Sequence, residues 1–256
     1  MNTFKWVLID DTKGAATVSG AKLSPAALAH IAEAVQAQFN GEFTREWGGS
    51  ATFRVGKDLT DIKDGEWAYV FRASLPDDPE ASAYHDIKKG VPYALCAVKT
   101  CTDLYGPNGV SVDASHEILE TAGDEGANLF ANDNKGELHA VELCDAVEVQ
   151  TYGKKCADGT VVQVSNWLLR AWFNPGAVGP YDYMSSAKLQ GAVAPAGPLK
   201  TAKGEGGNYQ IISKWGGDKE VTAVKTRIEG ERRKGKNLHW SSRTARRLDQ
   251  LAKLSK

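Results

Sequence analysis

Alternating and periodic hydrophobic positions predict a mixture of strands and helices along the chain. The clearest helix runs from residue 24 to 40, with Ser24 suited to cap it and Pro25 to its first turn. Its apolar stripe repeats at helical spacing and consists of Leu28, Ile31, Val35 and Phe39. Runs rich in β-branched and aromatic residues predict strands at 4–10, 51–55, 66–73, 92–99, 139–149, 159–169 and 209–213.

A second helix is predicted from residue 112 to about 121, with Ile118 and Leu119 as its apolar positions and Ser111 or Asp113 as its cap. Strands and helices follow one another without regular alternation, which favours an α+β fold. The segment 174–208 is rich in Gly and Pro, so the second half of the chain is expected to be rich in loops. The aromatic run "WLLRAWF" is expected to close the core.

The composition is that of an ordinary globular protein, with 42% hydrophobic and 25% charged residues in a chain of 256. Apolar runs are too short to cross a membrane, and the N-terminus has no signal-peptide pattern, so we expect a cytoplasmic protein, or a virion protein if it is phage-encoded. The four cysteines show no CxxC spacing. We therefore expect reduced thiols and no Cys-ligated zinc.

Charge divides the chain at about residue 224. Residues 225–256 contain 11 Lys/Arg and 3 Asp/Glu, a balance of +8, which leaves 20 against 29 in residues 1–224. A helical face in this tail consists of Trp240, Thr244, Leu248 and Leu251. We predict one domain at 1–224 and a basic helical tail at 225–256 that either contacts an acidic partner or nucleic acid or is simply solvated.

The segment "HEILE" contains the strongest candidate chemistry. On a helix, His116 and Glu120 lie one turn apart on the same side, where their side chains converge on one point. A hydrolytic metal site needs such neutral imidazole and carboxylate ligands, and Glu117 beside them could act as the general base. A solvated helical face is the alternative, because glutamate is common on helices.

Further candidates lie outside this helix. Glu142 and Asp145 fall in an otherwise apolar predicted strand, so one of them could be a third metal ligand, although a half-exposed strand edge would also explain them. His85, in a predicted loop, could point into a cleft or into solvent. Tyr152 could donate to a tetrahedral intermediate or simply pack.

Seven sequence words occur in order over roughly residues 4 to 213: "IAEAVQAQF", "REWGGSATFRV", "AYHDIKKGVPYAL", "SHEILE", "ELCDAVE", "VSNWLLRAWF" and "GGNYQI". In these words the chain resembles a family of uncharacterised bacterial and phage proteins with a zincin-like metallopeptidase layout. That resemblance implies a twisted mixed sheet, a backing helix at 24–40, an edge strand at 92–99 beside the cleft, and an active-site helix at 112–122.

The resemblance also implies a divalent metal, with zinc the first choice. Most zincins have a histidine where this chain has Glu120, and Gly126 stands where some have a third histidine. A ligand set of one histidine and carboxylates would accept manganese or calcium as well. The sequence therefore leaves two functions open: a metal-dependent peptidase, or a phage virion component that keeps a zincin-like scaffold for assembly.

Deleting residues 225–256 is expected to leave the fold intact and to weaken assembly or nucleic-acid retention. Circular dichroism and size-exclusion chromatography of the shortened chain check the fold, and retention on heparin checks the second effect. A shortened chain that fails to fold would instead make the tail part of the core.

Overall fold

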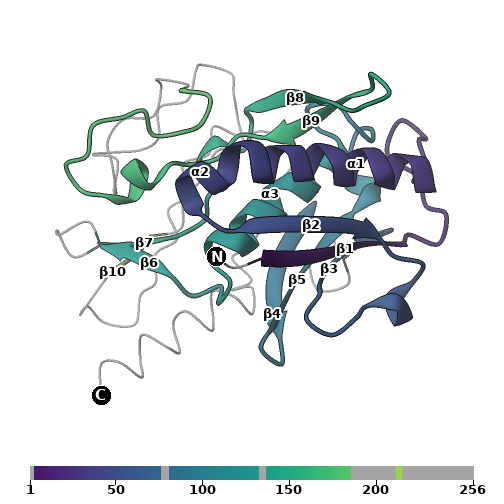
Figure 1. The fold of residues 1–256 in the computed structure, drawn as a ribbon, viewed down its shortest axis with the longest axis horizontal. Coiled ribbons are helices and arrows are strands. Elements are labelled where there is room, and N and C mark those ends of the chain that lie inside the picture. Colours follow the sequence, from purple (N-terminus) through teal and green to yellow (C-terminus); the bar gives the residue numbers. More distant parts are fainter. Residues whose placement is uncertain (1–2, 76–80, 133–136, 186–211, 215–256) are drawn as a thin grey trace. The chain divides into compact units, whose positions relative to one another are not determined.

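The structure, a computed structural model, describes residues 3–75, 81–132, 137–185 and 212–214 (Figure 1). The chain divides into two compact units, here called unit 1 (residues 1–122 and 151–165) and unit 2 (residues 123–150 and 166–256). The predicted α+β class is confirmed. The boundary predicted at residue 224, and the tail after it, lie outside the described residues.

Unit 1 is built on a mixed sheet of five strands within the described residues. These are β1 (Thr3–Asp11), β2 (Ser50–Val55), β3 (Trp67–Arg72), β4 (Ala83–Lys88) and β5 (Val91–Ala97), in the order β2-β1-β3-β5-β4. Four strands run parallel, and β4 pairs antiparallel with β5. Strands were predicted at four of these positions, and the fifth, β4, was missed.

The prediction that segment 92–99 forms an edge strand is wrong. This segment forms β5 inside the sheet, and β4, which pairs with β5, is the edge strand. A two-residue turn joins the pair: Lys88 pairs with Val91, and Lys89 and Gly90 have φ angles of 52° and 82°. This left-handed backbone at both turn positions matches the right-handed twist of a hairpin, and glycine adopts it without strain.

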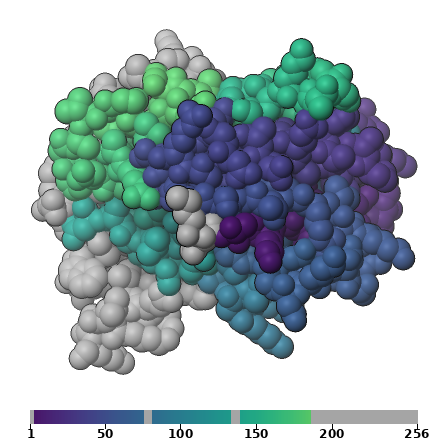
Figure 2. Space-filling model, viewed as in Figure 1, coloured from purple at the N-terminus to yellow at the C-terminus, as the bar shows by residue number. Residues whose placement is uncertain are grey.

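Helix α1 (Pro25–Gln38) forms as predicted, since the Ser24 hydroxyl accepts a hydrogen bond from the amide of Ala27 and Pro25 begins the helix. Its apolar stripe is buried against the sheet. Phe39, in the π-helical turn that follows (Phe39–Phe43), packs on Phe4 of β1 and Phe53 of β2. Exposed Glu33 and Gln36 lie on the outer side of α1, which crosses the face of the molecule seen in Figure 2.

Helix α3 spans Val110–Gly123, beginning earlier than predicted. Neither Ser111 nor Asp113 caps it, since both lie inside the helix. Ser111 instead donates a hydrogen bond to the carbonyl of Gln163, 2.7 Å away. The hydroxyl of Ser115 accepts one from the amide of Ser165 at 2.6 Å, within buried surroundings. The hairpin formed by β8 (Thr151–Lys155) and β9 (Val161–Ser165) thus holds α3 in unit 1.

The two faces of the sheet bury different chemistry. One face contributes an aliphatic cluster that consists of Val7, Ile9, Ala68, Val70, Leu75, Ala81, Leu95 and Ala97. Residues of β3, β4 and β5 that alternate with these point to the other face. Across that face, Tyr69, Ala94 and His85 lie in register on three adjacent strands. Ala94 contributes only a methyl group to this row, which leaves room for longer side chains.

Two predicted strands that lie wholly or partly in unit 2 are shorter in the structure. The strand predicted at 139–149 ends at Ala140: β7 (Glu137–Ala140) pairs with β6 (Phe130–Asn132) and β10 (Ile212–Lys214), and a 3₁₀ turn (Asp145–Val147) follows. The strand predicted at 159–169 shortens to β9, and the chain then enters unit 2. Its aromatic run does close a core, because Trp172 is fully buried with Ala146, Val147 and Leu168. Among the described residues, no helix is long and apolar enough to span a bilayer.

Glu66→Gln is expected to weaken unit 1 at pH 7 by roughly 1–2 kcal/mol. Arg54 holds both carboxylate oxygens of Glu66, at 2.7 and 2.6 Å, and lowers the pKa of Glu66 to about 2 from 4.5. Because the pKa of Glu66 is lower in the folded chain than in the unfolded chain, the ionised carboxylate stabilises the fold at pH values above about 4.5. This stabilisation disappears as the pH falls from about 4.5 to about 2. Urea denaturation across this window should therefore show wild type and variant converging at the acid end.

Asp64→Asn provides the control, since Asp64 is an exposed carboxylate in the same loop. Its stability should stay near wild type at both ends of the window. A gap between wild type and Glu66→Gln that persists at pH 2 would contradict the assigned role of the ion pair.

Candidate metal centre

One side of helix α3 carries three carboxylates. Asp113, Glu117 and Glu120 are spaced i, i+4 and i+7, so they follow one another along the same side of the helix. Glu117 and Glu120 are buried, at 6% and 0% exposure, and Asp113 is half-buried. Because a buried ionised carboxylate is costly unless it is compensated, the groups around these three residues determine what the helix can do.

His85 of the edge strand β4 reaches Glu117. Its Nδ1 lies 2.9 Å from a Glu117 carboxylate oxygen, a hydrogen bond, and 3.6 Å from an oxygen of Glu120. His85 is 2% exposed. Its place in the register beside Ala94 brings the imidazole to the face of the sheet that α3 covers. The prediction that His85 lies in a loop is wrong. His85 lies on strand β4, and this position directs its side chain toward α3.

His116 and Glu120 converge as the helical spacing predicted. Nε2 of His116 lies 3.4 Å from the other carboxylate oxygen of Glu120. Glu120 thus faces an imidazole with each of its oxygens, one from its own helix and one from β4. The structure therefore brings together the predicted ligands His116 and Glu120, the predicted base Glu117, and the predicted cleft residue His85.

The two imidazole–carboxylate pairs differ in their nitrogen–oxygen distances, which indicate different roles. An imidazole nitrogen and a carboxylate oxygen that share a tetrahedral zinc are about 3.3–3.4 Å apart, because each lies about 2.0–2.1 Å from the ion. The His116–Glu120 pair is spaced for a shared ion, at 3.4 Å. The His85–Glu117 pair, at 2.9 Å, is spaced for a direct hydrogen bond. Ligand atoms of His85, Glu117 and Glu120 still lie within 4.8 Å of one another, a group that could itself hold a cation.

Charge makes this cluster favourable for a cation. With neutral histidines it would bury two carboxylate charges in a site whose members are at most 6% exposed. Burial also raises the pKa of the nearby Tyr69 hydroxyl well above its usual range, and the carboxylates of Asp113 and Glu117 raise it further. A phenolate there would face other negative charges. A divalent ion would offset this excess of negative charge, so the residues present fit such an ion.

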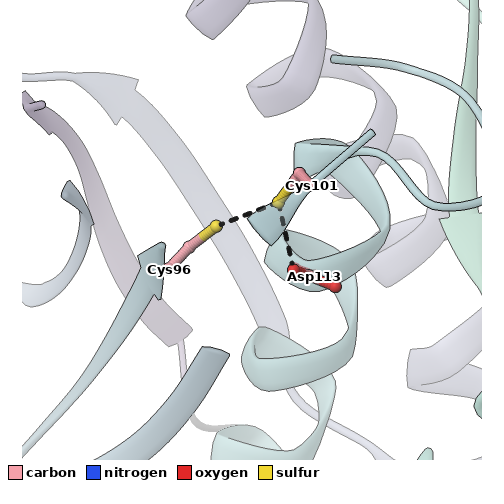
Figure 3. A group of neighbouring side chains, drawn as sticks. All are labelled: Cys96, Cys101 and Asp113. Carbon is pink, nitrogen blue, oxygen red and sulfur yellow. Dashed lines mark hydrogen bonds between the residues drawn. The ribbon is translucent and has the colours of Figure 1, made fainter. Parts of the chain in front are cut away.

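A second cluster lies at the N-terminal end of the same helix. The Cys101 thiol lies 3.3 Å from an Asp113 carboxylate oxygen and 4.0 Å from the sulfur of Cys96 (Figure 3). Both cysteines are fully buried. The hydrogen bond with Cys96, burial and the negative charge of Asp113 all raise the pKa of the Cys101 thiol. None of the four cysteines forms a disulfide, as the sequence predicted.

Two predicted metal ligands belong to unit 2. Glu142 follows β7, Asp145 begins the 3₁₀ turn, and both are buried at 3% and 1% exposure, not placed on a strand edge. The role of either one as a third ligand stays a prediction. His139 has no partner at metal-ligand spacing in the sequence and is therefore predicted to be a surface residue, which is wrong because it is fully buried in β7. His239 lies outside the described residues.

Tyr152 joins elements of unit 1 through its hydroxyl group, in keeping with the packing alternative, and a role in the metal centre stays a prediction. Its hydroxyl donates to a carboxylate oxygen of Glu42 at 2.6 Å and accepts from the side-chain amide of Gln38 at 3.0 Å. Lys154 contacts the other oxygen of Glu42. These bonds tie the β8–β9 hairpin to α1 and to the turn that follows it.

The sequence contained a signal for the imidazole–carboxylate cluster that was not used. In "YHDIKKGVPY" a Lys–Gly pair stands between two extended segments, the pattern of a two-residue hairpin, and it would have placed His85 on a strand. The cysteine cluster could not be found from spacing along the chain. Cys96 and Cys101 meet Asp113 only because β5 and α3 pack together.

Comparisons with protein-family models, with curated proteins and with solved structures gave no match to this chain. The function must therefore be argued from the geometry of unit 1.

Tyr152→Phe is expected to destabilise the chain by about 1 kcal/mol without changing its metal content. The variant loses hydrogen bonds to Glu42 and Gln38, but Gln38 keeps its bond to the carbonyl of Ser165 at 2.8 Å. Urea denaturation measures the first effect and elemental analysis the second. A loss of bound metal would show that Tyr152 belongs to the metal centre after all.

Proposed function

We propose that unit 1 is a zincin-like, metal-dependent hydrolase in which His116 and Glu120 hold a divalent ion. The observation that carries this proposal is the separation of 3.4 Å between the His116 nitrogen and the Glu120 oxygen, the spacing of two ligands of one ion. Both side chains are buried and project from one helix, so their relative geometry is fixed by α3 itself.

The arrangement of unit 1 supports a zincin-like layout. Helix α1 packs on the sheet as a backing helix, and β4 forms an antiparallel edge. Helix α3, which carries the HExxE residues, lies on the same face of the sheet as α1. Phe39, beside α1, contacts that face through Phe4, whereas α3 contacts it through His85. These elements follow one another in the order that the resemblance implies.

The roles of the remaining residues follow from the hydrogen bond between His85 and Glu117. A divalent ion in such a site supplies Lewis-acid polarisation and makes a water more acidic. Glu117 takes a proton from the attacking water and returns it to the leaving amine. His85 orients the Glu117 carboxylate through the 2.9 Å bond. A peptide bond is the substrate class that matches these roles.

The kind of ion follows from the ligands. One imidazole and one carboxylate make a harder site than a set of two histidines, so manganese competes with zinc for it. Glu142 or Asp145 of unit 2 remains the proposed source of a third ligand.

A second function is favoured by the depth of the site. His85, His116, Glu117 and Glu120 are at most 6% exposed, and closed metal sites are typical of structural centres. In this alternative the chain is a virion component whose ion stabilises a non-catalytic scaffold. Its partners would be other virion proteins, and the ion would not exchange with solution during turnover.

Elemental analysis of the purified full chain tests the proposal, with His116→Ala and Glu117→Gln beside wild type. His116→Ala should contain one equivalent of divalent metal fewer per chain, because it removes a ligand. Glu117→Gln should keep the ion, since the amide preserves shape, and should lower cleavage of an unfolded protein substrate at least about 100-fold. His85→Ala should also keep the ion and reduce the rate less severely.

His30→Ala provides the matched control, because His30 belongs to unit 1 but bonds to Tyr105 and Asp158, away from α3. It should retain both metal and activity. Unchanged metal content in His116→Ala would refute the site, and unchanged turnover in Glu117→Gln would refute the mechanism. Bound metal without hydrolysis in the wild type would favour the scaffold function.

A further inference from the structure

Three metal-binding groups from three segments meet at the N-terminal end of α3. Cys96 is the penultimate residue of β5, Cys101 follows the 3₁₀ turn (Val98–Thr100) after that strand, and Asp113 lies in the first turn of α3. In Figure 3, dashed lines join the Cys101 sulfur to both of the other groups. One ligand atom from each residue lies within 4.8 Å of the other two.

Two of the separations within this cluster are close to those of ligands that share one ion. Two sulfurs on a tetrahedral zinc are about 3.8 Å apart, and a sulfur and a carboxylate oxygen about 3.5 Å, because each sulfur lies about 2.3 Å and the oxygen about 2.0 Å from the metal. The structure has 4.0 Å between the sulfurs and 3.3 Å between the Cys101 sulfur and the Asp113 oxygen. Shifts of about 0.2 Å would meet the ideal values.

We propose that Cys96, Cys101 and Asp113 form a second metal site, which holds zinc through two thiolates and one carboxylate. Binding releases the two thiol protons to solvent, so that each sulfur becomes an anionic ligand and no redox step is involved. Thiolates select zinc over the harder ions that suit the His116–Glu120 site. The sequence expectation of no Cys-ligated zinc depended on spacing along the chain, which does not limit ligands brought together by folding.

A disulfide is the competing fate of two neighbouring thiols, and the geometry disfavours it. A disulfide requires sulfurs about 2.05 Å apart, so this pair would have to close by roughly 2 Å. Asp113 would have no part in such a bond, although its carboxylate approaches Cys101. Both thiols are also fully buried, which shields them from oxidants in solution.

The proposed site is structural. It ties the end of β5 and the turn after it to the first turn of α3, an attachment that sets the position of the helix over the sheet. Because the cysteines are buried, we expect the ion to enter while the chain folds and to exchange slowly. The site is independent of the proposed hydrolase function, since none of its ligands belongs to the His116–Glu120 centre.

The test uses the full chain, purified under reducing conditions from cells grown in cobalt-supplemented medium. Cobalt bound by thiolates has an intense near-ultraviolet sulfur-to-metal charge-transfer band, which imidazole and carboxylate ligands cannot produce. Wild type should show this band, and Cys96→Ser and Cys101→Ser should lose it. Cys156→Ser should keep it, because Cys156 is a buried thiol of unit 1 outside the cluster, near the carbonyl of His30.

His116→Ala should keep the band while losing one equivalent of metal, which separates failure of this site from failure of the first. If the serine variants fold poorly, Asp113→Asn should keep the fold and shift the band while weakening zinc retention against a chelator several-fold. Wild-type protein that folds without the band would overturn the proposal. Formation of a disulfide lowers the mass of the chain by about 2 Da. This mass difference in nearly all of the molecules would overturn the proposal as well.

Discussion

Burial of negative charge along one side of α3 is the constraint on which unit 1 depends. A helix packed against a sheet usually presents a hydrophobic stripe, but this one presents Asp113, Glu117 and Glu120. Each must find a compensating group, because an isolated buried carboxylate would cost more free energy than a small domain has available. The opposing strands supply thiols and an imidazole in place of aliphatic side chains.

This substitution explains why the sheet has two dissimilar faces. The aliphatic face excludes water and supplies part of the hydrophobic free energy of unit 1. The face toward α3 combines aromatic packing near β1 and β2 with polar groups near β4 and β5. The polar clusters are thereby confined to the β4–β5 side of one face, so that a change to one of them leaves the aliphatic face untouched.

The sequence predicted most of unit 1 because its elements have local signals. Helix α1 has a cap, a proline and a regular stripe, and four strands have dense runs of β-branched and aromatic residues. The convergence of His116 and Glu120 also follows from helical spacing alone. These features require no knowledge of tertiary contacts.

The errors arose where tertiary contacts decide the outcome. Glu142 and Asp145 looked like strand residues because of their apolar neighbours, but the chain turns there and buries them in unit 2. His139 and the cysteines were judged by spacing along the chain, although burial and packing determine their environment. His85 is the intermediate case, since its hairpin has a local signal in Lys89 and Gly90 that identifies the strand.

The discontinuity of unit 1 in sequence has a consequence for how the chain is made. Residues 123–150 are synthesised before the β8–β9 hairpin, yet the hairpin holds α3 through Ser111 and Ser115. During synthesis, the helix is therefore complete well before its hairpin anchors leave the ribosome, although the strands that supply His85 and Cys96 have already been made. A nascent chain shorter than about 165 residues already contains His85, Cys96 and Cys101 but lacks the bonds to Ser111 and Ser115, so the position of α3 over the sheet is fixed only when the hairpin is complete.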